Sequence, residues 1–77
     1  MDPYAVAVIV ATFGDERWAH QARTVAAPSA AAQQPGELRL EHAATLAEAR
    51  NAGAAATSTP WLCFLDADDE LDPGYLA

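Results

Sequence analysis

The run Ala5-Val6-Ala7-Val8-Ile9-Val10 places the strongest constraint on how this chain can fold. It is a continuous apolar run rich in β-branched residues, and no polar residue within it marks a face for solvent. This pattern is typical of a strand that is buried on both faces in a parallel sheet. Such a strand needs helices packed on each side of it, so the run predicts an α/β fold.

A helix is predicted to follow this strand. Gly14-Asp15-Glu16 indicates a helix start, with Asp15 as the N-cap and acidic residues where the helix dipole favours them. Trp18, Ala22 and Val25 then recur at helical spacing, which predicts that they face the sheet.

The chain continues with a break and a second strand. Pro28 is expected to interrupt or restart the helix, and Pro35-Gly36 is expected to end it. Leu38 and Leu40 alternate with polar residues, which predicts a short strand over residues 37–42.

A second helix and a third strand complete the predicted order. Thr45-Leu46-Ala47-Glu48 fits a capping box, so a helix is expected up to about Thr57. Residues 61–65 form a short apolar run that predicts a strand, and Asp72-Pro73 predicts the start of a new helix. The order β-α-β-α-β implies right-handed crossovers and a doubly wound, mainly parallel sheet.

Carboxylates cluster directly after the third apolar run. Five of the eleven acidic residues lie within residues 66–72. Like charges this close repel one another unless a cation, a donor-rich loop or water compensates them. Mg²⁺ and Mn²⁺ favour oxygen ligands, so Asp66 and Asp68 are candidate ligands of a metal-bound diphosphate. A solvated acidic turn is the alternative interpretation of the same residues.

Composition excludes several classes of function. The net charge of −7, with only four basic residues, argues against nucleic acid and anionic membrane surfaces as partners. The longest apolar run, Tyr4 to Ala11, is far shorter than the ~18–20 residues of a membrane span. No basic leader precedes it, so a cytoplasmic location is expected. The lone Cys63 is interpreted as a small buried hydrophobe, which suits a reducing compartment.

The predicted topology brings three polar segments to one edge. Ligands of open parallel sheets bind outside the carboxyl ends of the strands. Residues 12–15, 42–45 and 66–69 are expected there. Together they offer an aromatic ring, small or hydroxyl-bearing residues and the acidic cluster, a combination that suits a nucleotide base, a ribose and a metal-bound diphosphate.

Three segments resemble a known family. They are Val6 to Phe13 with its acidic helix start, Ala49-Arg50-Asn51-Ala52-Gly53, and Phe64-Leu65-Asp66-Ala67-Asp68-Asp69 with Pro73 after it. Together they look like the N-terminal nucleotide-sugar-binding part of a family 2 glycosyltransferase with the GT-A fold. The resemblance implies that residues 1–77 form one partial GT-A, Rossmann-like domain, truncated after its D-x-D motif. It also implies an enzyme that transfers a sugar from a nucleotide-diphosphate sugar to an acceptor and depends on Mg²⁺ or Mn²⁺.

The resemblance assigns roles to individual residues. Phe13 matches an aromatic residue near the nucleotide base, and Arg50 an arginine near the nucleotide. Asp66 matches the first D-x-D carboxylate, near the ribose and the metal, and Asp68 the second, a direct metal ligand. The residues expected to bind the donor are Thr12, Phe13, Asp15, Arg50 and Asp66, and the expected metal ligands are Asp66 and Asp68.

The chain also departs from the family pattern. Gly14 stands where the family usually has Asn, and no strand ends in Asp-Asp-Gly-Ser, whose Asp contacts the base. A β-α unit is missing between Gln34 and Glu37. Either Glu41 or His42 substitutes for the lost contact, or the chain is a non-catalytic remnant or interaction module. The family's acceptor site and general base follow the D-x-D region, so no catalytic residue is assigned and the 77 residues alone are expected to be inactive.

One other enzyme class is disfavoured. Phosphoryl-transfer enzymes of the D-x-D-x-T type carry that motif after their first strand, whereas here it follows the last predicted strand. Glu70 also stands where that motif needs a hydroxyl. Self-association is expected, because a small sheet of this kind has open edges.

Overall fold

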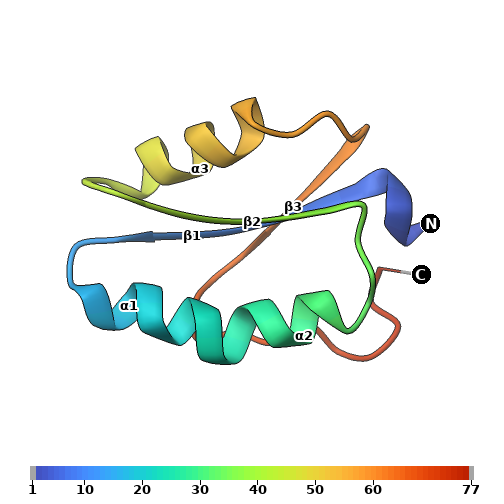
Figure 1. The fold of residues 1–77 in the computed structure, drawn as a ribbon, viewed down its shortest axis with the longest axis horizontal. Coiled ribbons are helices and arrows are strands. Elements are labelled where there is room, and N and C mark those ends of the chain that lie inside the picture. Colours follow the sequence, from blue (N-terminus) through green and yellow to red (C-terminus); the bar gives the residue numbers. More distant parts are fainter. Residues whose placement is uncertain (1, 77) are drawn as a thin grey trace.

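The computed structural model describes residues 2–76, which form a three-stranded parallel sheet between helices (Figure 1). The strands are β1 (Val6–Phe13), β2 (Glu37–Ala43) and β3 (Trp61–Leu65), in the spatial order β2-β1-β3. Both outer strands pair with β1 in parallel. The predicted α/β fold and its three strands are confirmed.

Helices cover both faces of the sheet (Figure 1). One face is covered by a continuous helical segment made of α1 (Glu16–Gln21), a π-helical turn η2 (Ala22–Ala26) and α2 (Ala27–Ala31). The other face is covered by α3 (Leu46–Ala55), and a short 3₁₀ helix, η1 (Pro3–Ala5), precedes β1. Among residues 2–76, no helix has the length and apolar character that crossing a membrane requires.

Side-chain caps mark the starts of α1 and α3, and a π-helical turn precedes the proline of α2. The Asp15 carboxylate accepts the Arg17 N–H at 2.9 Å, and the Thr45 hydroxyl accepts the Glu48 N–H at 3.2 Å, so both predicted helix starts are confirmed. Pro28 is the second residue of α2, two positions after the last residue of the π-helical turn. Proline has no N–H for the carbonyl one turn earlier and its ring crowds that carbonyl, which the wider π turn accommodates.

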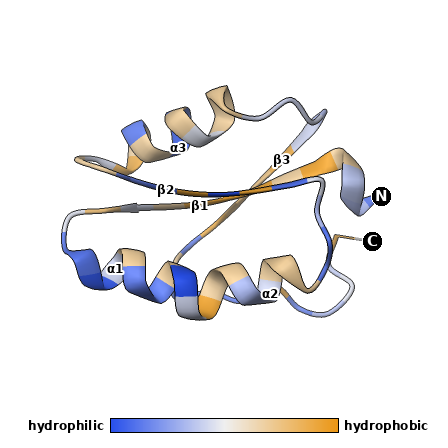
Figure 2. Ribbon diagram, in the orientation of Figure 1, coloured by the Kyte–Doolittle hydropathy of each residue, from blue (hydrophilic) through white to orange (hydrophobic). Residues whose placement is uncertain are grey.

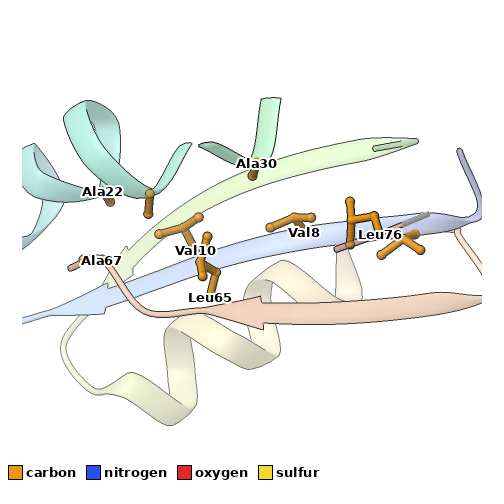
Figure 3. Close-up of a cluster of buried hydrophobic side chains, with 9 residues drawn as sticks. Val8, Val10, Ala22, Ala30, Leu65, Ala67 and Leu76 are labelled. Carbon is orange, nitrogen blue, oxygen red and sulfur yellow. The ribbon is translucent and has the colours of Figure 1, made fainter. Parts of the chain in front are cut away.

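β1 is buried on both faces, as predicted. Its even-numbered residues face the α1–α2 layer, where Val8 and Val10 pack against Ala22, Ala26 and Ala30 (Figure 3). These alanines are spaced four residues apart along one face of the helical segment. Their small side chains let the helix backbone approach a strand of bulky β-branched residues.

The prediction that Trp18, Ala22 and Val25 face the sheet is therefore partly wrong. Ala22 is buried as expected, but Val25 is only half-buried and Trp18 is 38% exposed. Helical spacing alone did not separate the alanine face from the neighbouring face that carries these two larger residues. Trp18 lies in the first turns of α1, near the carboxyl edge of the sheet, where the core ends.

The opposite face of β1 packs against α3 through a second apolar cluster. Ile9 and Ala11 are buried there with Ala49. Gly53 of α3 lies directly over Ile9, because a Cβ atom at this position would be 2.5 Å from Ile9 Cγ2. Glycine thus sets how closely α3 packs onto the sheet.

The two edges of the sheet differ in character. β2 alternates hydrophilic and hydrophobic residues (Figure 2), and Glu37, Arg39 and Glu41 place charge along it. β3 carries no charged residue, and Trp61, Leu62 and Phe64 are exposed. Charged side chains protect a strand edge from pairing with other chains, so β2 is protected and β3 is not.

Cys63 lies in the middle of this apolar edge strand. It is a free, half-buried thiol that packs against the larger cluster. Burial raises the pKa of the Cys63 thiol, because the thiolate would lose hydration there. The thiol therefore stays protonated at neutral pH, and Cys63 behaves as a small hydrophobe, although it is half-buried and not fully buried as the sequence predicted.

The new helix predicted from Asp72-Pro73 is not found in the part of the chain that the structure describes, up to Leu76. Residues 73–76 form turns, and the Tyr75 N–H bonds to the Asp72 carbonyl at 3.0 Å. The Gln33 side chain takes the groups that a helix would need, since its amide donates to the Asp72 carbonyl at 2.6 Å and accepts the Leu76 N–H at 2.8 Å. A tertiary contact therefore overrides the local helix signal.

Substituting Gly53 tests the packing of α3. We expect Gly53→Ala to lower the free energy of unfolding by about 1–3 kcal/mol, because the added methyl group overpacks against Ile9. Helix propensity alone would raise stability by about 1 kcal/mol. Urea unfolding measures the difference, with Ala52→Gly at the neighbouring exposed position as a propensity control. A Gly53→Ala chain as stable as the parent would contradict the close approach.

The unprotected edge predicts self-association through β3. We expect sedimentation to show concentration-dependent oligomers and Leu62→Lys to shift them towards monomer, because a charge on the strand opposes edge-to-edge pairing. Leu40→Lys on β2 is the matched control, since the two leucines are 42% and 40% exposed. A parent chain that stays monomeric over the accessible concentrations, or a Leu40→Lys chain that responds as strongly, would contradict this role of β3.

Candidate functional site

The carboxyl ends of the three strands meet at one edge of the sheet. Thr12 is aligned with His42, and Val10 is aligned with Leu65, the last residue of β3. The acidic segment that starts at Asp66 therefore leaves the sheet beside the end of β1, as predicted. A depression of about 270 Å³ lies there, lined by Thr12, Phe13, Trp18, Leu46, Asp66, Ala67 and Asp68.

This depression has an apolar wall and an acidic wall. Phe13, at the end of β1, is 49% exposed, and Trp18 and Leu46 lie on the same depression from the starts of α1 and α3. Asp66 and Asp68 form the acidic side. Its volume is near the lower end of ligand pockets, which start at ~300 Å³, so it suits part of a ligand. Trp18 and Leu46 were not predicted as site residues; their positions in the first turn of each helix were the available signal.

Three carboxylates of the acidic segment lie close together. Asp66, Asp68 and Asp69 each offer an oxygen, and these oxygens lie within 4.8 Å of one another on exposed side chains. A turn gathers them, because the Asp69 N–H bonds to the Asp66 carbonyl at 3.0 Å. The two expected metal ligands are thus side by side, with Asp69 as a third oxygen donor.

Arg50 reaches this segment from α3. Its guanidinium lies 3.8 Å from the Asp66 carboxylate and 5.7 Å from the centre of the Phe64 ring. The side chains of Arg50 and Asp66 are 43% and 63% exposed, so the ion pair adds little to stability. The pair does bring a positive charge next to the acidic cluster.

Asp15 lies in the turn after β1, at the start of α1. Its carboxylate caps α1 and is not among the groups that line the depression. Gly14 within this turn has a φ of +76°, in the left-handed region that Gly and Asn adopt most readily. Gly14 therefore keeps the turn that an Asn in the family pattern would also allow.

The end of β2 is tied to the end of β1 by side-chain hydrogen bonds. Thr12 is 5% exposed, and its hydroxyl lies 2.7 Å from His42 Nδ1. The other ring nitrogen, Nε2, lies 3.0 Å from the Gly14 carbonyl. Glu41, the other candidate to replace the missing base contact, pairs with Arg39 at 3.0 Å. Both candidates are thus already engaged, and β2 lies directly beside β1 with no strand between them.

The acidic segment is also fixed at its far end, to α2. The Ser29 hydroxyl donates to the Ala26 carbonyl at 2.8 Å and accepts the Leu71 N–H at 3.0 Å. Gln33 holds the backbone of residues 72–76, as described above. We call Ser29 and Gln33 the latch. Ser29 lies on α2 and Gln33 in the turn just after it, and their spacing of four residues was the sequence signal for the latch.

Comparison with family models gives a match over most of the chain. The family model described as glycosyl transferase family 2 matches residues 19–77. No curated protein and no solved structure matches the chain. The matched residues include α3, β3 and the whole acidic segment.

Removing the Gln33 half of the latch tests how residues 72–76, at the far end of the acidic segment, are held. Gln33→Ala deletes both hydrogen bonds to residues 72–76, so we expect the Leu76 amide to exchange its hydrogen about tenfold faster. Hydrogen exchange followed by NMR measures this. Gln21→Ala on α1 is the matched control and should leave the rate unchanged. Equal exchange rates in the parent and Gln33→Ala would show that the segment is held by other contacts.

Proposed function

Because the chain belongs to glycosyltransferase family 2, we propose that its carboxyl edge is the donor-binding part of a glycosyltransferase and takes a nucleotide-diphosphate sugar. One observation carries this proposal: Phe13, Thr12 and the acidic pair Asp66 and Asp68 line a single depression. An aromatic surface and a carboxylate cluster at this edge match the two ends of such a ligand, its base and its diphosphate.

Each wall of the depression then has a role in binding. The exposed Phe13 ring offers a surface on which the nucleotide base stacks, and Trp18 widens that surface. Asp66 accepts hydrogen bonds from the ribose hydroxyls. Arg50, beside Asp66, adds a positive charge that attracts the phosphates.

The acidic residues fit Mg²⁺ or Mn²⁺. These ions prefer oxygen ligands, and opposite ligands of Mg²⁺ lie about 4.2 Å apart. The oxygens of Asp66, Asp68 and Asp69 lie within 4.8 Å of one another, so a small adjustment brings them onto one ion. When bound, such an ion neutralises charge on the diphosphate and so stabilises it as a leaving group.

A second candidate function is a non-catalytic remnant or interaction module of this family. It is favoured by the end of β2, where His42 and Glu41 are both held by other protein groups. Neither then substitutes freely for the base-contacting residue of the missing segment. In this case the acidic cluster is only a solvated turn.

Metal binding with and without nucleotide separates the two candidates. Two or three carboxylates bind Mn²⁺ weakly, so we expect tighter Mn²⁺ binding in the presence of UDP or GDP, whose phosphates supply the remaining oxygens. The expected coupling is ~1–3 kcal/mol, measured by titration calorimetry. Asp68→Asn should abolish it.

The matched control is Asp72→Asn, which removes a charge from the same segment outside the carboxylate cluster. It should retain the coupling. Equal, weak Mn²⁺ binding by the parent and Asp68→Asn, with or without nucleotide, would contradict donor binding and support the remnant.

A further inference from the structure

His42 connects three points at the carboxyl edge of the sheet. It is the penultimate residue of β2, and its two ring nitrogens reach Thr12 and Gly14, on either side of Phe13. Phe13, which forms part of the apolar wall of the depression, thus lies between two residues that are hydrogen-bonded to His42.

The chemistry of the partners fixes the protons on the ring. A carbonyl oxygen only accepts, so His42 Nε2 carries a proton and donates it to the Gly14 carbonyl at 3.0 Å. In the neutral ring, Nδ1 is then an acceptor, and the Thr12 hydroxyl donates to it at 2.7 Å. The alternative acceptor for that hydroxyl, the Glu41 carbonyl, is farther away at 3.4 Å. Both ring nitrogens are satisfied by the protein, so neither is free to contact a ligand.

The turn after β1, at Phe13 and Gly14, needs the hydrogen bonds of His42 to hold it in place. Phe13 ends β1 and is 49% exposed, so few contacts hold its ring. Gly14, the next residue, has no side chain, and a glycine backbone has access to more conformations than any other. The bond from His42 to the Gly14 carbonyl restricts the backbone at this point.

We propose that His42 is a positioning residue for donor binding: its two hydrogen bonds hold the turn after β1 so that Phe13 presents its ring to the nucleotide base. This inference rests on the proposed function. It gives His42 an indirect role, in place of the direct base contact that the missing segment would have supplied.

Two conservative substitutions separate the two hydrogen bonds. The side-chain amide of His42→Gln extends to the position of Nε2 and can still donate to the Gly14 carbonyl. The shorter amide of His42→Asn reaches the position of Nδ1 and can bond only to Thr12. His42→Ala makes neither bond. UDP binding in the presence of Mn²⁺ is measured by titration for the full chain, with thermal unfolding recorded in parallel.

We expect His42→Ala and His42→Asn to bind UDP about three- to tenfold more weakly, the loss that corresponds to one ordinary hydrogen bond. His42→Gln should stay within about twofold of the parent. A purely structural role would change thermal stability but would not separate the Gln and Asn variants in affinity. His20→Asn is the matched control, because His20 is an exposed histidine on α1, outside the groups that line the depression.

A second readout does not depend on nucleotide. The ¹⁵N resonances of the neutral His42 ring should show a protonated Nε2 and an unprotonated Nδ1, and Thr12→Val should shift the Nδ1 resonance. The opposite tautomer, or a parent chain and variants that all bind UDP equally, would overturn the role of His42. A parent chain that does not bind UDP would overturn the proposed function together with this role. In that case the ¹⁵N resonances would still show whether His42 makes the two hydrogen bonds.

Discussion

The burial of β1 on both faces is the constraint on which the rest of the structure depends. A strand with valines on one face and Ile9 and Ala11 on the other is stable only when an apolar layer covers each side. The chain provides these layers with small residues: alanines spaced four apart in the α1–α2 segment, and Ala49 and Gly53 in α3. Because both outer strands run parallel to β1, the carboxyl ends of the three strands and the polar segments that follow them share one edge.

The features that sequence predicted well are those set by neighbouring residues. The apolar run of β1, the Asp15 cap and the Thr45 capping box are local signals, and the structure contains all three. The expectation that Thr12 and Asp66 share an edge followed from parallel topology, which local order already implied.

The features that were missed depend on contacts between distant segments. The side of the helical segment that faces the sheet was assigned from helical spacing alone. Spacing does not show where the sheet beneath the helix ends, and therefore which residues are buried: Ala22, Ala26 and Ala30 are, and Trp18 is not. The turn after Pro73 reflects bonds to Gln33, about forty residues away, and the two bonds of His42 span about thirty. Sequence patterns of a few residues carry no information on such partners.

The latch gives the acidic segment a property that its composition alone would not. Ser29 and Gln33 hold the backbone on the far side of the carboxylate cluster, and β3 holds the near side, so the protein's own contacts keep Asp66, Asp68 and Asp69 together. Their mutual repulsion therefore opposes folding. The fold thus carries an electrostatic cost at this edge of the sheet, which dissolved salt relieves by screening.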